Sequence, residues 1–324
     1  MRFDVRQCVA LSAALLLCMT QAVAQNNDRR FTQTPAGATV EEVLVTGEHP
    51  GPGMWKVTNG DNSLWILGTH SPLPQRLTWR SQDVEFAISE AQQVLGNYSA
   101  SFTMREGSPL DMKSKRLRRL LSRRDYSQWQ SLKRKYIGQS AEIETALPVT
   151  AALVLRSNAF AQMGLANADA VIKELYRLAQ AYHVPVTNDH QVTKVIAGMP
   201  AGADAQRKGV QFLVSTMKSL EGDLTAARIR ANAWAVGDIE ALRAQAAADT
   251  TTARLYASSW PYLTEDELTA LTVETDTRWL DAAEQALRRN RTTVATLPIF
   301  MLLRPDGLLS ALRTRGFEVI EPVY

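Results

Sequence analysis

Cysteine is missing from nearly all of this chain. Both of its cysteines lie within the first 24 residues, so the 300 residues that follow contain no thiol. Disulfide bonds and thiolate metal sites are therefore excluded from that larger part. Histidine is scarce too, and no two of the four histidines have the i, i+4 spacing of a helical zinc site. These four residues are His49, His70, His183 and His190.

Long apolar runs are also missing after residue 24. Before it, two arginines precede an apolar run over Val9–Met19, and Ala22-Val23-Ala24 has the small-x-small pattern of a cleavage site. This arrangement is typical of a secretory signal peptide, and the run is shorter than the roughly 20 residues that span a bilayer. We therefore expect a signal peptide over residues 1–24 and an exported protein, periplasmic or secreted, without a transmembrane segment in its mature part. Acylation at Cys18 is less favoured, because Leu17 precedes it where a small residue is usual.

Glycine-rich phosphate-binding motifs are absent, so the sequence does not indicate a nucleotide site. The net charge of +3 is close to neutral for 324 residues. Residues 25–53 are polar and rich in Gly, Pro and Thr, which predicts a flexible leader with a short extended piece at Val43–Val45. We find no internal repeat in the remainder and expect one domain over residues 54–324.

Strand and helix signals alternate at the start of that domain. The apolar segments Met54–Val57 and Leu64–Leu67 flank Asn59-Gly60, a dipeptide that favours a tight hairpin turn. Ser81 then has the character of a helix N-cap, and Gly96 that of a helix stop. The apolar positions between them follow the 3.6-residue period of a helix, at Val84, Ala87, Ile88, Ala91 and Leu95.

The middle of the chain, from about 111 to 250, is predicted to be mostly helical. Within it, His183–Thr187 has the pattern of a short strand. Thr264 and Glu267 form a capping box that opens a helix to about Asn290. Near the end, Asp306 is placed to cap the last helix. The sequence thus predicts a mixed α/β (α+β) fold, with a central mixed sheet formed by N- and C-terminal strands and a large helical insertion.

Two segments carry a resemblance to a known family. Residues 54–80 contain a hairpin followed by Gly-Thr-x-x-Pro-Leu-Pro, which resembles the N-terminal signature of the TraB/GumN family. That family includes the Tiki-type metalloproteases. Residues 294–323 are similar to the family's closing strand, helix and strand. The resemblance implies the mixed fold described above and an ancestral metal-dependent hydrolytic site.

The positions that match the family's reactive residues carry other side chains. Where the family has Gly-Thr-x-His, this chain has Gly68 and Thr69 followed by His70 and Ser71, so serine occupies the histidine position. Met301 occupies that of a second family histidine. The family's glutamate falls near Gly96 or Asn97, and a mid-chain acidic position falls within 188–190, where Asp189 can substitute. The resemblance therefore implies a degenerate site, for which we expect no metal and no other cofactor.

Two functions remain open at this point. The first is a non-catalytic binding or accessory protein of the cell envelope, linked to exopolysaccharide by the GumN name. The alternative is a metal-dependent peptidase or hydrolase with relocated ligands, which requires His70 to cluster with Asp189 or His190. No catalytic residue is assigned. If the ancestral cleft survives, its candidate residues are Gly68, Thr69, His70, Ser71, Asp189, His190, Arg278 and Arg304.

A basic run lies between Lys113 and Lys135. It holds ten lysines or arginines and the single acid Asp125, and apolar residues are interleaved with them. Such a face attracts an anionic polysaccharide or lipid surface over about 8 Å in physiological salt. Nucleic acid is not expected as a partner of an exported protein. The simpler interpretation is a solvated helix pair with a buried Leu and Trp stripe. The candidate surface residues are Arg118, Arg119, Arg123 and Arg124.

Overall fold

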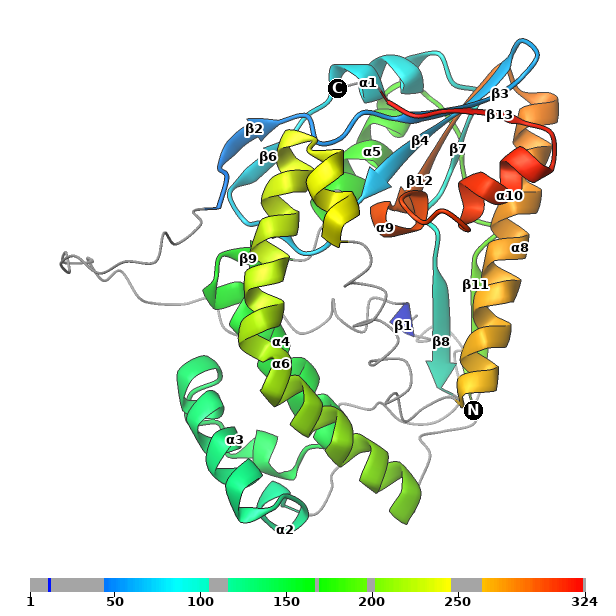
Figure 1. The fold of residues 1–324 in the computed structure, drawn as a ribbon. Coiled ribbons are helices and arrows are strands. Elements are labelled where there is room, and N and C mark those ends of the chain that lie inside the picture. Colours follow the sequence, from blue (N-terminus) through cyan, green and yellow to red (C-terminus); the bar gives the residue numbers. More distant parts are fainter. Residues whose placement is uncertain are drawn as a thin grey trace, which may run out of the picture.

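A mixed six-stranded sheet forms the centre of the molecule (Figure 1). The computed structural model describes residues 11–12, 44–104, 116–166, 169–196, 202–245 and 264–322. The strand order is β10-β7-β12-β4-β3-β13. The bounds are β3 Trp55–Asn59, β4 Asn62–Thr69, β7 Gln93–Leu95, β10 Val186–Thr187, β12 Thr292–Pro298 and β13 Glu318–Ile320. The predicted α/β class is confirmed, because strands from both ends of the chain share one sheet.

Four neighbouring strands of this sheet are mutually parallel. β12 pairs in parallel with β4 on one side and β7 on the other, and β7 pairs in parallel with β10. β3 is antiparallel to both β4 and β13. The β3–β4 hairpin is confirmed at the predicted place, with Asn59 opposite Asn62 and Gly60 at φ +59°. Positive φ in this tight turn is a conformation that glycine adopts without strain.

The first helix, α1, is shorter than the sequence predicted. It begins after its N-cap, Ser81, whose hydroxyl accepts from the amide of Val84, and it spans Gln82–Ser89. The prediction that it reached Gly96 is wrong, because Val94 and Leu95 belong to β7. Both residues are buried, and β7 pairs with strands on each side. These distant partners override the local helical period.

The predicted helical region contains six α-helices and one 3-10 helix within the residues described there, the sixth α-helix covering residues 239–245. α4 and the long α6 pack along each other and extend away from the sheet, with α2 and α3 against their far end (Figure 1). α6 ends at Gly237, which has φ +76°, and Asp238 starts the next helix, as predicted. The bounds are α2 Leu117–Leu120, α3 Arg123–Tyr136, η2 Glu142–Thr145, α4 Pro148–Gln162, α5 Asp169–Ala181 and α6 Ala203–Val236.

The predicted strand at His183–Thr187 is only partly correct. The structure has β10 over Val186–Thr187, whereas His183 has φ +57°. Its neighbour Val184 donates its amide to the carbonyl of Ala179. This 6→1 bond is the hydrogen-bond pattern that ends many helices, with a left-handed residue at the position of His183. The segment before Val186 therefore closes α5.

Smaller strands hold the flanking segments in place. β8 Ala100–Met104 pairs with β11 Val192–Ile196 and with β1 Leu11–Ser12. β5 Leu73–Pro74 pairs with β9 Leu165–Ala166, and β2 Gly47–His49 pairs with β6 Leu77–Trp79. The end of the predicted leader is thus joined to the domain at β2. Trp79 reinforces this contact, because its Nε1 donates to the carbonyl of Pro50 at 2.8 Å.

The C-terminal part contains α8 Glu265–Arg289, α9 Ile299–Leu302 and α10 Leu308–Thr314. The capping box of α8 is confirmed, with reciprocal bonds between Thr264 and Glu267. The capping role predicted for Asp306 is wrong, because Gly307 is the N-cap of α10 and receives no side-chain bond there. Asp306 instead lies 3.4 Å from Arg304 in an ion pair. No described helix is both long enough and apolar enough to cross a membrane.

Candidate functional site

The carboxyl ends of the four parallel strands meet along one edge of the sheet. β4 ends at Thr69, which pairs in register with Pro298 at the end of β12. At the other side of β12, β7 ends at Leu95 and pairs with Thr187 at the end of β10. Open parallel sheets bind their ligands at this edge. The segments that follow the four strands carry the sequence positions that the family resemblance singled out.

The Gly68-Thr69 pair builds the end of β4. The carbonyl oxygen of Gly68 accepts a buried hydrogen bond of 2.7 Å from Trp234 Nε1 on α6. A Cβ atom on Gly68 would lie 2.9 Å from Ile299 Cγ1, so α9 packs directly against this strand end. Thr69 Oγ1 donates to the carbonyl of Leu297 at 3.3 Å. These contacts give the pair a structural role, and Ser71 beyond it is exposed.

His70 places its ring at this edge. Its Nε2 is buried and has no hydrogen-bond partner within the described chain, although the residue as a whole keeps some exposure. Burial, followed by the positive charge of Arg230, lowers the pKa of His70 to about 3. The imidazole is therefore neutral at pH 7, which is the form that ligates metals and accepts hydrogen bonds.

His190 is buried and engaged in a different part of the edge. Its Nε2 lies 3.1 Å from the carbonyl oxygen of Gly96, just after β7. Because a carbonyl only accepts, this nitrogen carries the proton and cannot ligate a metal in this arrangement. Burial lowers the pKa of His190, while backbone hydrogen bonds and the charge of Asp189 act in the opposite direction. Asp189 itself is exposed.

A tyrosine and a carboxylate complete this region, and the sequence patterns gave no indication of them. The hydroxyl of Tyr98 donates to Asp276 Oδ1 on α8 at 2.6 Å. Burial and then Asp276 raise the pKa of Tyr98, and the charge of Arg304 opposes them. Arg304 is therefore close enough to act on this pair. Arg278 pairs with Glu274 at 2.9 Å on the exposed face of α8, and no described contact joins it to the strand ends.

The described residues at this edge show no cluster of metal ligands. Within the described parts of the chain, no group of three or more His, Cys, Asp or Glu side chains is placed to hold one. His70, Asp189 and His190 are therefore not gathered as a set of three metal ligands. Met301, at the second family histidine position, is buried in the core.

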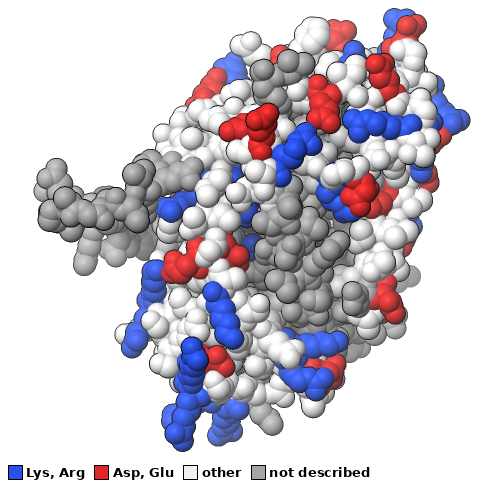
Figure 2. Space-filling model, viewed as in Figure 1, with Lys and Arg blue, Asp and Glu red and all other residues white. Residues whose placement is uncertain are grey.

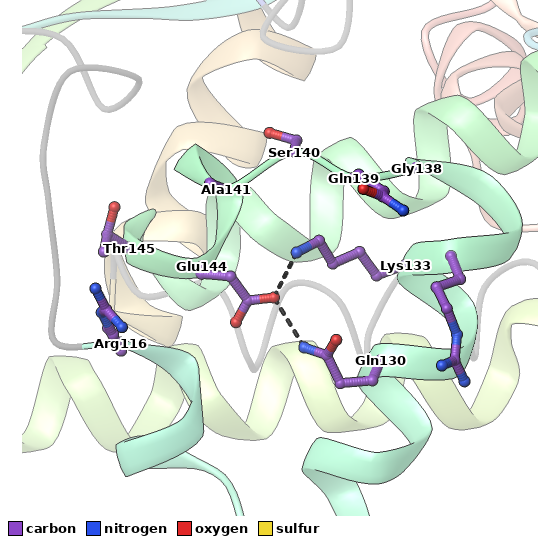
Figure 3. A pocket seen from close by; sticks show the side chains of 10 residues that line it. Arg116, Gln130, Lys133, Gly138, Gln139, Ser140, Ala141, Glu144 and Thr145 are labelled. Atoms are coloured by element: carbon purple, nitrogen blue, oxygen red, sulfur yellow. Dashed lines mark hydrogen bonds and ion pairs between the residues drawn. The ribbon is translucent and has the colours of Figure 1, made fainter.

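A separate pocket lies in the helical region, between α3 and η2 (Figure 3). It has a volume of about 430 Å³. Three cationic side chains and one carboxylate line it, together with amides and hydroxyls. Its lining includes Arg116, Gln130, Lys133, Arg134, Gln139, Ser140, Glu144 and Thr145.

Glu144 joins η2 to α3 through several donors. Its Oε1 accepts from Lys133 at 2.8 Å, from Gln130 at 2.9 Å and from Trp129 Nε1 at 3.1 Å. Burial alone would raise the pKa of Glu144, but these hydrogen bonds outweigh it and lower the pKa. The carboxylate is thus ionised at neutral pH, and its Oε1 accepts from three donors.

The basic face lies on α2 and the first turn of α3, and its arginines do not line the pocket. Arg118, Arg119, Arg123 and Arg124 are all exposed, whereas Leu117 and Trp129 are buried beneath them. Figure 2 shows blue side chains gathered over this end of the molecule. The predicted buried stripe is therefore present, and the arginines around it face solvent.

These features define a mixed α/β domain with a candidate site at its parallel strand ends and a basic helical lobe. A family model described as TraB/PrgY/gumN family matches residues 53–321. The chain therefore belongs to the TraB/PrgY/gumN family, as its terminal motifs indicated. No curated protein and no solved structure matches it significantly.

Proposed function

We propose that this chain is an exported, non-catalytic member of its family that serves the cell envelope as a binding or accessory protein. The observation that carries this proposal is the state of the two histidines at the strand ends. His190 Nε2 donates to the carbonyl of Gly96. Within the described chain, His70 is not grouped with two further His, Cys, Asp or Glu side chains that could hold a metal ion with it. On this proposal, the residues of the ancestral hydrolytic site no longer catalyse a reaction and only stabilise the edge of the sheet.

Metal content and hydrolysis test this proposal together. The mature protein, purified without chelator and incubated with Zn²⁺, should retain far less than one metal per chain after desalting. It should not cleave unstructured peptides. About one tightly held metal per chain, lost in His70→Ala and kept in His183→Ala, would contradict the proposal. His183 is the matched control because it is exposed and lies outside the strand-end segments.

One observation favours the hydrolase alternative. The buried Nε2 of His70 is unpartnered in the described chain and its ring is neutral, so a ligand or substrate could hydrogen-bond to or coordinate this nitrogen. The same measurement decides between the two functions. Peptide cleavage that depends on added metal and on His70 would establish the alternative.

Export is part of the same proposal and rests on the pattern of residues 1–24. Mass spectrometry of the protein recovered from the periplasm or medium should show Gln25, or its cyclised form, at the N-terminus. A lipid on Cys18 would instead place the protein on a membrane. Recovery of the uncleaved chain only from the cytoplasm would contradict export.

For the binding partner, we propose an acidic polymer of the envelope, engaged through the basic face. Four exposed arginines lie there, on α2 and the first turn of α3, and like charges gathered this way attract polyanions. Replacing Arg118, Arg119, Arg123 and Arg124 with Gln keeps most of each side chain. Co-sedimentation with acidic polysaccharide at low salt should weaken at least about tenfold. Equal binding by both proteins would show that these arginines are only a solvated face.

A further inference from the structure

The pocket between α3 and η2 has an excess of positive charge within reach of a small ligand. Arg116 and Arg134 are exposed at its rim, and neither has a carboxylate partner within the described residues. Lys133 is nearly buried at its wall, and its ammonium points across the pocket toward Glu144 (Figure 3). An anionic group entering here would meet cations from three different positions.

Glu144 does not cancel this excess. Its charge is compensated by Lys133, and Gln130 and Trp129 also hold it at the wall, so two of the three positive charges remain uncompensated. An ammonium has three donors, and among the described residues Lys133 uses one of them, to Glu144. Lys133 therefore retains donors for a ligand, and its position is fixed before the ligand arrives. Such preorganisation lowers the entropic cost of binding.

The remaining wall matches a sugar better than a lipid surface. Gln130, Gln139, Ser140 and Thr145 offer amides and hydroxyls, which suit the many hydroxyl groups of a saccharide. Its volume falls within the range of about 300–1,000 Å³ for small-molecule sites. Helices that bind at a membrane surface present exposed apolar side chains beside their basic residues. The large exposed apolar residues of the described chain lie elsewhere, and none is on α2, α3 or η2.

We propose that this pocket binds a carboxylated sugar unit of an acidic polysaccharide. Arg116 and Arg134 would contact the carboxylate, since a guanidinium matches its two oxygens, and Lys133 would contact it from within. The amides and hydroxyls would bind the ring hydroxyls. This inference rests on the proposed function and adds to it, because the basic face then only attracts the polymer and the pocket selects its acidic unit.

Calorimetry with a short oligogalacturonate tests the proposal on the mature protein. The neutral comparison is the same oligomer with its carboxyls methyl-esterified. Arg134→Gln removes a pocket charge. Arg124→Gln is the comparison for the basic face, because Arg124 is one of the four face charges, lies on the same helix and does not line the pocket. We expect Arg134→Gln to weaken binding about tenfold or more. Arg124→Gln should change it less than about threefold, and the ester should not bind detectably.

Each other result has a distinct meaning. Equal weakening by the two variants would overturn the pocket and leave diffuse binding by the basic face intact. Binding of the methyl ester as tightly as the acid would also overturn it, since the carboxylate would then not be recognised. Binding of anionic phospholipid vesicles without the oligomer would replace the sugar by a lipid surface. Failure of the wild-type protein to bind any polyanion would overturn both this inference and the proposed binding function.

Discussion

Trp234 Nε1 lies 2.7 Å from the carbonyl oxygen of Gly68 and donates a buried hydrogen bond to it. The two residues are 166 positions apart, one on α6 and the other at the end of β4. The same glycine packs against Ile299 of α9. Gly68 is thus the point at which a helix from the middle of the chain and one from its end fix the strand edge.

We predict that Trp234→Phe destabilises the fold. The substitution leaves the buried carbonyl of Gly68 without its donor and creates a small cavity, at a combined cost of about 2–4 kcal/mol in the free energy of unfolding. Urea denaturation followed by circular dichroism measures this loss. Trp65→Phe is the control on β4, where the indole is half-buried beneath the Lys56 ammonium, and it should cost less than about 1 kcal/mol. Equal losses would contradict the special role of Trp234.

Gly68→Ala should also destabilise, for a steric reason. Its Cβ would approach Ile299 Cγ1 to 2.9 Å and Leu302 Cδ1 to 3.1 Å, so α9 must shift, at a cost of about 1–3 kcal/mol. Gly222→Ala on α6 is the matched control, because its Cβ would meet nothing within 4 Å. In a helix interior this change should stabilise by about 0.5–1 kcal/mol. The two variants should therefore shift the urea midpoint in opposite directions.

Glu144→Gln should weaken the attachment of η2 to α3. It leaves the nearly buried Lys133 without its counter-ion, which costs about 3 kcal/mol. The wild-type pair is also pH-dependent. Because the folded-state pKa of Glu144 is lowered, its contribution is fully present above the ordinary value of 4.5 and is lost as the pH falls through the folded-state value. Unfolding at pH 7 and pH 3 should show a smaller difference between variant and wild type at the lower pH.

His70 should make the stability of the fold depend on pH in a higher range than Glu144 does. The unfolded chain binds a proton near the ordinary pKa of 6.5, whereas the folded ring resists protonation down to about 3. Stability should therefore fall as the pH drops below 6.5, by at most about 1.4 kcal/mol per pH unit from this group. His70→Gln should decline less between pH 7 and pH 5. A His70 ring signal that titrates by NMR within that interval would refute this assignment.

Local signals in the sequence predicted local structure well. The Asn59-Gly60 turn and the Thr264 capping box rest on groups at most a few residues apart, and both are present. Val94 and Leu95 were misassigned because their partners, β10 and β12, lie about 90 and 200 residues further along the chain. No periodic pattern carries that information.

The candidate site, too, could be predicted from the sequence only in part. The family motif located His70 and the strand end that carries it, because that motif is continuous in the sequence. Tyr98 and Asp276 are 178 residues apart and belong to no motif, so only the fold shows that they meet. The pocket beside Glu144 was likewise hidden, although the basic run that contributes to its lining was evident from composition.

The place of β12 also bears on when the chain can fold. Residues 292–298 pair with β4 on one side and β7 on the other, so the last tenth of the chain supplies an inner strand of the sheet. Domains fold during synthesis from the N-terminus onward when their contacts are local. Here β4 and β7 do not pair with each other. The strand that joins them, β12, is synthesised more than 190 residues after β7. A nascent chain is therefore unable to close this sheet before residue 298 has been made, so its earlier strands lack their inner neighbour until then.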